Sequence, residues 1–111
     1  MRFLSLLLLA PAVWADACPN SNFSGPVRGD WNGWGIGGAN ARYQAEPGLT
    51  AAQVPNLKLK WAFGFPNAKQ VWGQPTIAGG WVFVATDTGS VYALDAATGC
   101  THWTYDAGTG V

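Results

Sequence analysis

One short run in the sequence has a residue type and spacing known from catalysis, namely Asp87-Thr88-Gly89. In aspartic proteases two carboxylates share one proton, so such a loop requires a second copy that meets it. The chain contains a single copy. The alternative is a hairpin turn, in which Asp accepts a backbone hydrogen bond and Gly adopts a positive φ. Because Asp95-Ala96-Ala97-Thr98-Gly99 repeats this turn chemistry, we predict that Asp87 is a turn residue.

The chain also contains residue types that ligate metals. Calcium loops supply oxygen ligands at a characteristic spacing, and the Asp residues of this chain do not follow it. Cys100 and His102 provide two ligands, whereas a structural zinc site needs four. We therefore expect a structural role for His102, which is the only His in the chain. The Asp residues that we expect in turns are Asp30, Asp87, Asp95 and Asp106.

Residues 1–15 have the pattern of a secretory signal peptide. Arg2 precedes an apolar run, and the run ends in small residues at Val13 and Ala15, as signal-peptide cleavage requires. This run is shorter than the ~20 residues that cross a bilayer, and no other segment of the sequence approaches that length. We therefore expect residues 1–15 to be removed, a periplasmic or secreted chain, and no transmembrane segment.

The two cysteines, Cys18 and Cys100, agree with export. An even number of cysteines in an oxidising compartment favours a disulfide, and a Cys18–Cys100 bridge would close a long loop, which favours stabilisation in the chain-entropy account. The alternative is a lipid anchor on Cys18, although Ala15 and Asp16 suit that processing poorly. Both alternatives are compatible with the sequence.

The composition excludes several classes of function. The chain has 111 residues, of which 15 are Gly, 7 are Trp and 11% are charged. Its formal net charge is zero, and it falls to about −1 when Arg2 leaves with the signal peptide. Proteins that bind nucleic acids carry clustered basic residues. We therefore expect no nucleic-acid partner.

The residue pattern predicts an all-β architecture. Residues 16–56 show little periodicity, except for a capping-box sequence at residues 50–53 that predicts a short helical turn. Over residues 57–63 apolar residues alternate with others at a period of two, which is typical of a half-buried strand. Gly-containing turns separate the apolar runs that follow. The strands expected there span residues 72–78, 81–86, 90–95 and 101–105, with Thr101, Trp103 and Tyr105 on one face.

These strands have the length of one β-propeller blade. A blade is a four-stranded antiparallel meander of about 40 to 45 residues, and several blades must combine to bury their faces. Four blades need on the order of 160 residues, more than the 96 that follow the signal peptide. We therefore expect an incomplete β-propeller. Its parts are an irregular N-terminal segment at residues 16–56 and the start of the propeller at residues 57–111, where one blade follows a strand of a neighbouring blade.

The sequence from Ala93 to Trp103 resembles the tryptophan-docking repeat of pyrroloquinoline-quinone (PQQ) β-propellers. The resemblance implies that Trp103 packs between blades, and that Asp95 and Gly99 belong to the turn on which such a Trp rests. Upstream, residues 40–44 and 48–61 resemble the entry segment of quinoprotein dehydrogenases. Three further runs, at residues 31–35, 61–66 and 73–76, are similar to polyvinyl-alcohol dehydrogenases.

The resemblance implies a periplasmic enzyme that oxidises an alcohol and passes electrons through PQQ to a cytochrome c. In such enzymes a calcium ion polarises the quinone carbonyl and an Asp accepts the hydroxyl proton. Those residues lie on later blades in the family, so we assign no catalytic or metal-binding residue here. Where many relatives place an acidic side chain against the cofactor, this chain has Trp72 and Gln74. These two residues are the candidates for cofactor contact.

Two functions are compatible with the sequence. The first is that of the N-terminal part of a PQQ-dependent alcohol dehydrogenase of the polyvinyl-alcohol type. This stretch alone is then expected to be inactive, because one blade cannot enclose a cofactor. The second is a non-catalytic PQQ-like propeller that acts as a protein-binding scaffold in the cell envelope. The run Trp31-Asn32-Gly33-Trp34-Gly35 favours the first, because such scaffolds lack it.

Overall fold

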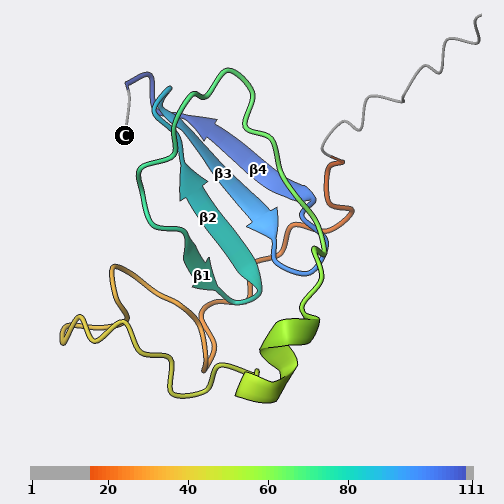
Figure 1. The fold of residues 1–111 in the computed structure, drawn as a ribbon. Helices are drawn as coiled ribbons and strands as arrows, with labels where there is room; N and C mark the ends of the chain where they lie inside the picture. Colours follow the sequence, from red (N-terminus) through yellow and green to blue (C-terminus); the bar gives the residue numbers. More distant parts are fainter. Residues whose placement is uncertain (1–15, 110–111) are drawn as a thin grey trace, which may run out of the picture.

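A four-stranded antiparallel sheet forms the centre of the molecule, and irregular segments surround it (Figure 1). The computed structural model describes residues 16–109, so the signal peptide expected at residues 1–15 lies outside the described residues. The strands follow one another in space as they do in sequence, which confirms the expected meander of an incomplete β-propeller. They are β1 (Thr76–Ala78), β2 (Trp81–Ala85), β3 (Ser90–Asp95) and β4 (Thr101–Asp106).

The central strands β2 and β3 are apolar on both faces, and both faces are covered. On one face Phe23 packs against Trp81 and Phe83, with ring centroids 5.2 and 5.9 Å apart. The side chains of these two strands supply most of the core, because a strand covered on both sides buries successive residues. The buried apolar residues are Ala78, Trp81, Val84, Tyr92, Ala93 and Leu94.

The segment that follows the helix covers the opposite face of the sheet. In Figure 1 this green segment passes in front of the strands. Phe63 and Phe65 pack edge-on against Tyr92 of β3, with ring centroids 5.5 and 5.1 Å apart. Tyr92 pairs with Val84 and lies one residue from Ala93, which pairs with Phe83. Since successive residues of a strand point to opposite faces, the blade lies between two stretches of the N-terminal segment.

The structure corrects the expected strand over residues 57–63. Among residues 16–109, this segment forms no β-ladder with any strand. Of its four alternating apolar residues, Trp61 and Phe63 are half-buried, whereas Leu57 and Leu59 are exposed. A period of two is not sufficient for a strand, which also requires a partner with free backbone groups. The described residues supply no such partner here.

The first strand of the blade is shorter than the sequence suggests. The expected strand over residues 72–78 is reduced to β1, which begins at Thr76, directly after Pro75. Proline has no N–H to donate to a ladder, so it is found at the start of a strand or at a sheet edge. On its outer side, Ile77 forms an isolated antiparallel bridge with Trp31, and its N–H donates to the Trp31 carbonyl at 2.7 Å.

A bulge in β4 changes which residues share a face. Thr101 pairs with Leu94, but Trp103 pairs with Ala93, so two residues of β4 advance for one of β3 and His102 is inserted. Leu94 and Ala93 point to opposite faces. The expectation that Thr101, Trp103 and Tyr105 share a face is therefore wrong for Thr101, because a bulge shifts the alternation by one residue.

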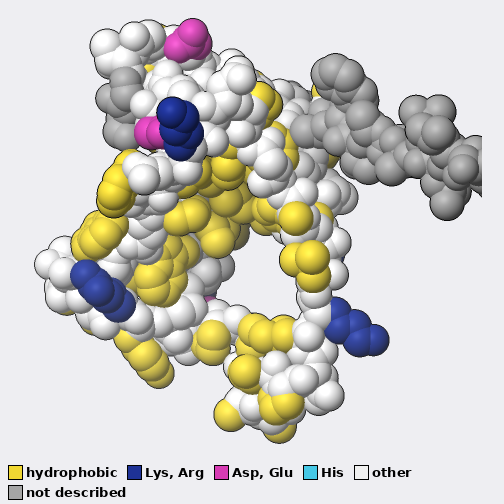
Figure 2. All heavy atoms as spheres, turned by 45° about the horizontal axis from the view of Figure 1, so that its top comes forward, with side chains coloured by type: hydrophobic (Ala, Val, Ile, Leu, Met, Phe, Trp, Pro, Cys, Tyr) yellow, Lys and Arg dark blue, Asp and Glu magenta, His cyan; other side chains and the backbone are white. Residues whose placement is uncertain are grey.

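The expected helical turn is present as the 3₁₀ helix η1 (Ala51–Asn56). The N–H of Thr50 donates to Oε1 of Gln53 at 2.8 Å, as the capping-box sequence predicts. In the part of the chain that the structure describes, no helix has the length and apolar character needed to cross a membrane. Figure 2 shows hydrophobic side chains gathered across the centre of one face, with only a few charged side chains around them.

Candidate functional site

The turn between β3 and β4 is organised by Asp95. Its Oδ1 accepts hydrogen bonds from the N–H of Ala97 at 3.0 Å, the N–H of Thr98 at 2.7 Å and the Thr98 hydroxyl at 2.8 Å. The Thr98 hydroxyl, followed by the two backbone donors and by nearby His102, holds the pKa of Asp95 below its ordinary value, against the opposing effect of burial. The carboxylate therefore fixes the backbone course from Asp95 to Gly99.

Trp61 rests on this turn at Gly99. A Cβ built on Gly99 would lie 2.7 Å from the Trp61 indole, and Gly99 has φ of 76°. Only glycine combines that backbone conformation with so close an aromatic neighbour. The indole Nε1 also donates to the carbonyl of Ala96 at 3.1 Å. Close packing on Gly99 and one hydrogen bond to Ala96, 35 residues away in sequence, thus hold Trp61 against this turn.

Trp103, the tryptophan of the predicted docking repeat, is in a different environment. It is 40% exposed, and its nearest aromatic neighbour is Phe83 at 6.0 Å between ring centroids. The turn of the repeat meets Trp61 at Gly99 and Ala96, and Trp61 comes from outside the sheet. Trp103 therefore presents its ring on the outer strand of the blade, where the described residues leave it partly open.

The start of β4 is tied to the N-terminal segment. Cys18 and Cys100 are joined by a disulfide with 5.2 Å between their Cα atoms. Beside it, the N–H of Cys18 donates to the Thr101 carbonyl and the N–H of Thr101 donates to the Asp16 carbonyl, each at 2.9 Å. These bonds form a short parallel bridge at Ala17 and Thr101. Both a covalent bond and backbone pairing thus hold this part of the N-terminal segment against β4.

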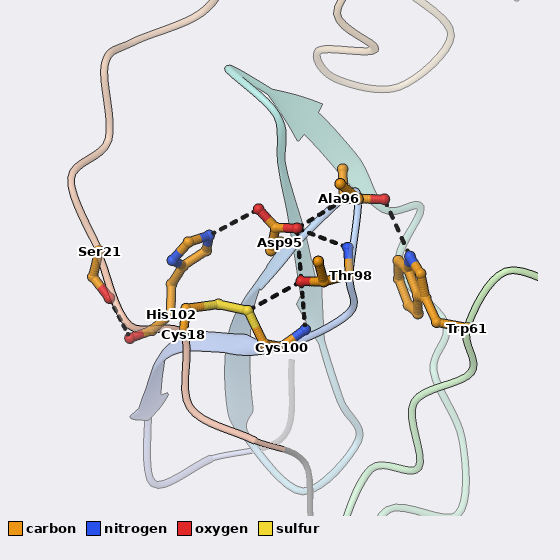
Figure 3. A network of polar contacts seen from close by, with 9 residues as sticks. Cys18, Ser21, Trp61, Asp95, Ala96, Thr98, Cys100 and His102 are labelled. Carbon is orange, nitrogen blue, oxygen red and sulfur yellow. Dashed lines mark hydrogen bonds and ion pairs between the residues drawn. A yellow bond between two sulfur atoms is a disulfide. The ribbon is translucent and has the colours of Figure 1, made fainter.

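His102 lies beside this bridge, on the same face as Trp81. Its ring stacks on the Trp81 indole with 3.7 Å between centroids and 9° between planes. The side chain is only 6% exposed, and its Nε2 lies 3.7 Å from Oδ2 of Asp95 (Figure 3). Sequence reasoning expected a structural histidine but not this position. The bulge that turns His102 inward leaves no signal in the alternation of residue types.

An open pocket of about 220 Å³ lies where these groups meet. An imidazole and a carboxylate both border it. Its lining includes Cys18, Asp95, Thr98, Cys100 and His102. The side chains come from the N-terminal segment, the β3–β4 turn and the bulge of β4, so residues 82 positions apart form one site.

The other candidate carboxylates serve turns. The N–H of Gly89 donates to the Thr86 carbonyl, which confirms the turn interpretation of the run at residues 87–89. Oδ1 of Asp87 does not bond within this turn but accepts the N–H of Lys69 at 3.2 Å. Asp30 accepts backbone N–H groups from Val27 and Gly79. Within residues 16–109, no three or more His, Cys, Asp or Glu side chains form a group that could hold a metal ion.

The two cofactor-contact candidates do not form a site with these groups. Trp72 is 73% exposed and Gln74 is half-buried, and neither lines the pocket beside Asp95 and His102. The structure therefore does not bring Trp72 or Gln74 together with the titratable groups of that pocket. Both residues stay candidates for cofactor contact, and we derive no chemical step through PQQ or calcium.

Comparison with known proteins agrees with the arrangement of a propeller blade. Residues 31–110 match the family described as "PQQ: Glucose/ethanol/alcohol dehydrogenase, beta-propeller domain". A polyvinylalcohol dehydrogenase of Pseudomonas sp is 57% identical over 77 residues, and one of Sphingopyxis sp. (strain 113P3) is 47% identical over 77 residues. A quinohemoprotein alcohol dehydrogenase of Comamonas testosteroni is 32% identical over the same length.

Each of these matches covers 69% of the chain but only 11 to 12% of the relative. The chain therefore spans a small part of the length of these relatives. The matched region contains η1, all four strands, Trp61 and the turn on which Trp61 rests, so sequence similarity and blade geometry coincide. This chain belongs to the PQQ β-propeller family of glucose, ethanol and alcohol dehydrogenases.

Proposed function

We propose that this chain forms the first blade and the preceding segment of a periplasmic, PQQ-dependent alcohol dehydrogenase of the polyvinyl-alcohol type. The observation that carries the proposal is the 57% identity with a polyvinylalcohol dehydrogenase over 69% of the chain. The full-length enzyme would use PQQ as its redox cofactor together with a calcium ion, both held mainly by residues outside this chain. A cytochrome c would receive the electrons, and relatives named a 1-butanol dehydrogenase (cytochrome c) and a lupanine 17-hydroxylase [cytochrome c] support this partner.

The contribution of this chain to such an enzyme is the fixed position of its blade. Trp61 packs on Gly99 on one side of the β3–β4 turn, and the Cys18–Cys100 disulfide ties the other side of the turn to the N-terminal segment. Trp103 and Tyr105 of β4 are 40% and 62% exposed, and they offer apolar surface on the outer strand to a neighbouring blade. Apolar patches of this kind mark interaction surfaces. The residues of this chain would therefore orient the cofactor chamber without contributing a reacting group.

The test is reconstitution of the full-length protein with PQQ and Ca²⁺, followed by dye-linked oxidation of polyvinyl alcohol and of short alcohols. We expect turnover that requires PQQ and that is faster with the polymer than with ethanol. Protein to which no PQQ is added is the control. If the protein binds PQQ but oxidises only short alcohols, the substrate assignment fails. If it neither binds PQQ nor turns over any alcohol, the envelope-scaffold alternative replaces the enzyme.

A further inference from the structure

Residues 28–46 form a loop whose two arms are joined by hydrogen bonds. The N–H of Arg42 donates to the Gly35 carbonyl at 2.8 Å, and Nε2 of Gln44 donates to the Gly29 carbonyl at 2.7 Å. In Figure 1 this orange-to-yellow loop extends away from the sheet beside β1. The 28–46 loop is therefore a projection that its own hydrogen bonds hold in one conformation.

The base of the 28–46 loop is attached to β1 and to the turn that follows it. The Trp31 carbonyl accepts the N–H of Ile77 at 2.7 Å, and Oδ2 of Asp30 accepts the N–H of Gly79 at 2.9 Å. β1 forms the edge of the sheet opposite β4. The blades of a propeller surround a central channel. Because β4 is the outer strand of the blade, the 28–46 loop extends from the edge that faces this channel.

The backbone of the 28–46 loop is strained, although the loop adds almost nothing to the core. Within residues 16–109, three of the four non-glycine residues with a positive φ lie in it, namely Ile36 at 59°, Asn40 at 47° and Arg42 at 51°. A β-branched residue in this region is a rare outlier, and such strain is concentrated at binding and active sites. Gly35 is the only buried residue of the loop. Core packing therefore does not account for this conformation, whereas a binding role does.

The 28–46 loop presents an aromatic ring beside a cation that has no acidic partner. Trp34 is 61% exposed, and Cζ of Arg42 lies 5.6 Å from the centre of its ring. The two carboxylates of the loop are engaged elsewhere, Asp30 by backbone N–H groups and Glu46 by Arg28. Within residues 16–109 Arg42 forms no salt bridge, so its N–H donors remain available for hydroxyl oxygens. The ring offers an apolar face for C–H groups.

We propose that Trp34 and Arg42 form a site that binds a segment of polyvinyl alcohol and positions the polymer for oxidation. The inference rests on the proposed function, in which this polymer is the substrate. Polyvinyl alcohol alternates methylene groups with carbons that carry a hydroxyl, so it matches both the ring and the guanidinium. Most units of a long polymer lie outside the reacting centre and contact other surfaces, whereas ethanol is too small to do so. Trp34 and Arg42 are therefore positioning residues that favour the polymer over short alcohols.

Binding is tested with the full-length protein, without PQQ, by electrophoresis in native gels that contain increasing concentrations of polyvinyl alcohol. We expect the polymer to retard the unaltered protein, and we expect Trp34→Ala to require roughly tenfold more polymer for the same retardation. Trp34→Phe retains an aromatic face and should restore most of the retardation. Arg42→Gln, which leaves the ring in place, should weaken it by a smaller factor. Circular dichroism of each variant establishes that it folds.

Kinetics of the protein reconstituted with PQQ and Ca²⁺ give a second measurement. For Trp34→Ala the KM for polyvinyl alcohol should rise roughly tenfold at unchanged kcat, while both constants for ethanol stay unchanged. The site is overturned if the gels do not retard the unaltered protein, if they retard Trp34→Ala equally, or if this variant loses activity toward ethanol as severely as toward the polymer. Absence of PQQ-dependent turnover with every alcohol would contradict the proposed function instead, and the gels would still decide whether the site binds the polymer.

Discussion

Two segments hold the β3–β4 turn, one on each side, and they do so by different means. Figure 3 shows Trp61 on one side of the turn, and His102 and the disulfide on the other. The Trp61 ring packs directly on the backbone of Gly99, so this position has no room for a side chain. Cys18 makes a covalent contact that needs only a neighbouring sulfur.

This difference determines how each contact responds to change. The Trp61 contact depends on van der Waals packing and one hydrogen bond, so it is insensitive to redox conditions but intolerant of added atoms. The disulfide tolerates changes in neighbouring shape but fails under reduction. The turn from Asp95 to Gly99 is therefore held by the Trp61 contact under reducing conditions and by the disulfide when the packing is altered. A substitution can remove either contact without the other.

The largest expected effect is that of Gly99→Ala. The new Cβ would lie 2.7 Å from the Trp61 ring, at a φ of 76°. Strain in the left-handed region and overpacking together predict a loss of roughly 2 to 5 kcal/mol in unfolding free energy. Thermal unfolding of the full-length protein measures it. Gly37→Ala is the matched control, because Gly37 also has a positive φ, of 70°, but a Cβ there meets nothing within 4 Å. In a Trp61→Ala background the Gly99→Ala cost should shrink, and equal costs in both backgrounds would refute the packing contact.

Removal of the covalent contact should have the next largest effect. A Cys18→Ser/Cys100→Ser double variant should lose about 2 to 4 kcal/mol, because the bridge restricts the unfolded chain. Denaturant unfolding with and without reductant measures this loss. Reductant should destabilise the unaltered protein to a similar extent and leave the double variant unchanged. A variant as stable as the oxidised parent would show that the backbone pairing at Ala17 and Thr101 suffices.

The turn itself should show a dependence on acid. Because the folded-state pKa of Asp95 is lowered by Thr98 and its neighbours, the carboxylate stabilises the folded state above the unfolded pKa of about 4. That stabilisation is lost as the pH falls through the lowered folded pKa. Asp95→Asn should therefore cost about 1 kcal/mol at neutral pH and flatten the stability profile below about pH 4. A parallel profile for both proteins would exclude Asp95 as the source.

The smallest effect on stability is expected at Trp72. Its side chain is 73% exposed, so Trp72→Ala should change the unfolding free energy by less than about 0.5 kcal/mol. Titration of the full-length variant with PQQ tests its candidate role in cofactor contact. Unchanged PQQ affinity would remove Trp72 from the list of cofactor contacts. Weaker binding together with unchanged stability would establish that role.

Three of the four blade strands could be predicted closely because their signals are local, whereas β1 is shorter than expected. Alternation of residue types and Gly-containing turns gave residues 90–95 for β3, which is its observed range, and ranges within one residue for β2 and β4. The strand over residues 57–63 could not be judged in the same way. Alternation pointed to Trp61 and Phe63, which are half-buried, but also to Leu57 and Leu59, which are exposed. Only the tertiary structure determines whether a partner strand is present.

The candidate site was less accessible to prediction because it depends on contacts that are distant in sequence. The docking repeat located the turn at Asp95 and Gly99 but did not identify Trp61 as the ring that rests on it. The inward position of His102 results from a bulge, and its stacking on Trp81 brings together residues of two different strands. No local pattern in the sequence encodes either feature.

The disulfide has a topological consequence for limited proteolysis. It joins residues 82 positions apart, so η1, β1, β2 and β3 all lie within one covalent loop. A single protease cut in the exposed stretch around Leu59 would leave the two pieces linked. Such a nicked molecule would migrate as one species on a non-reducing gel, and it would separate into two only after the bridge is reduced.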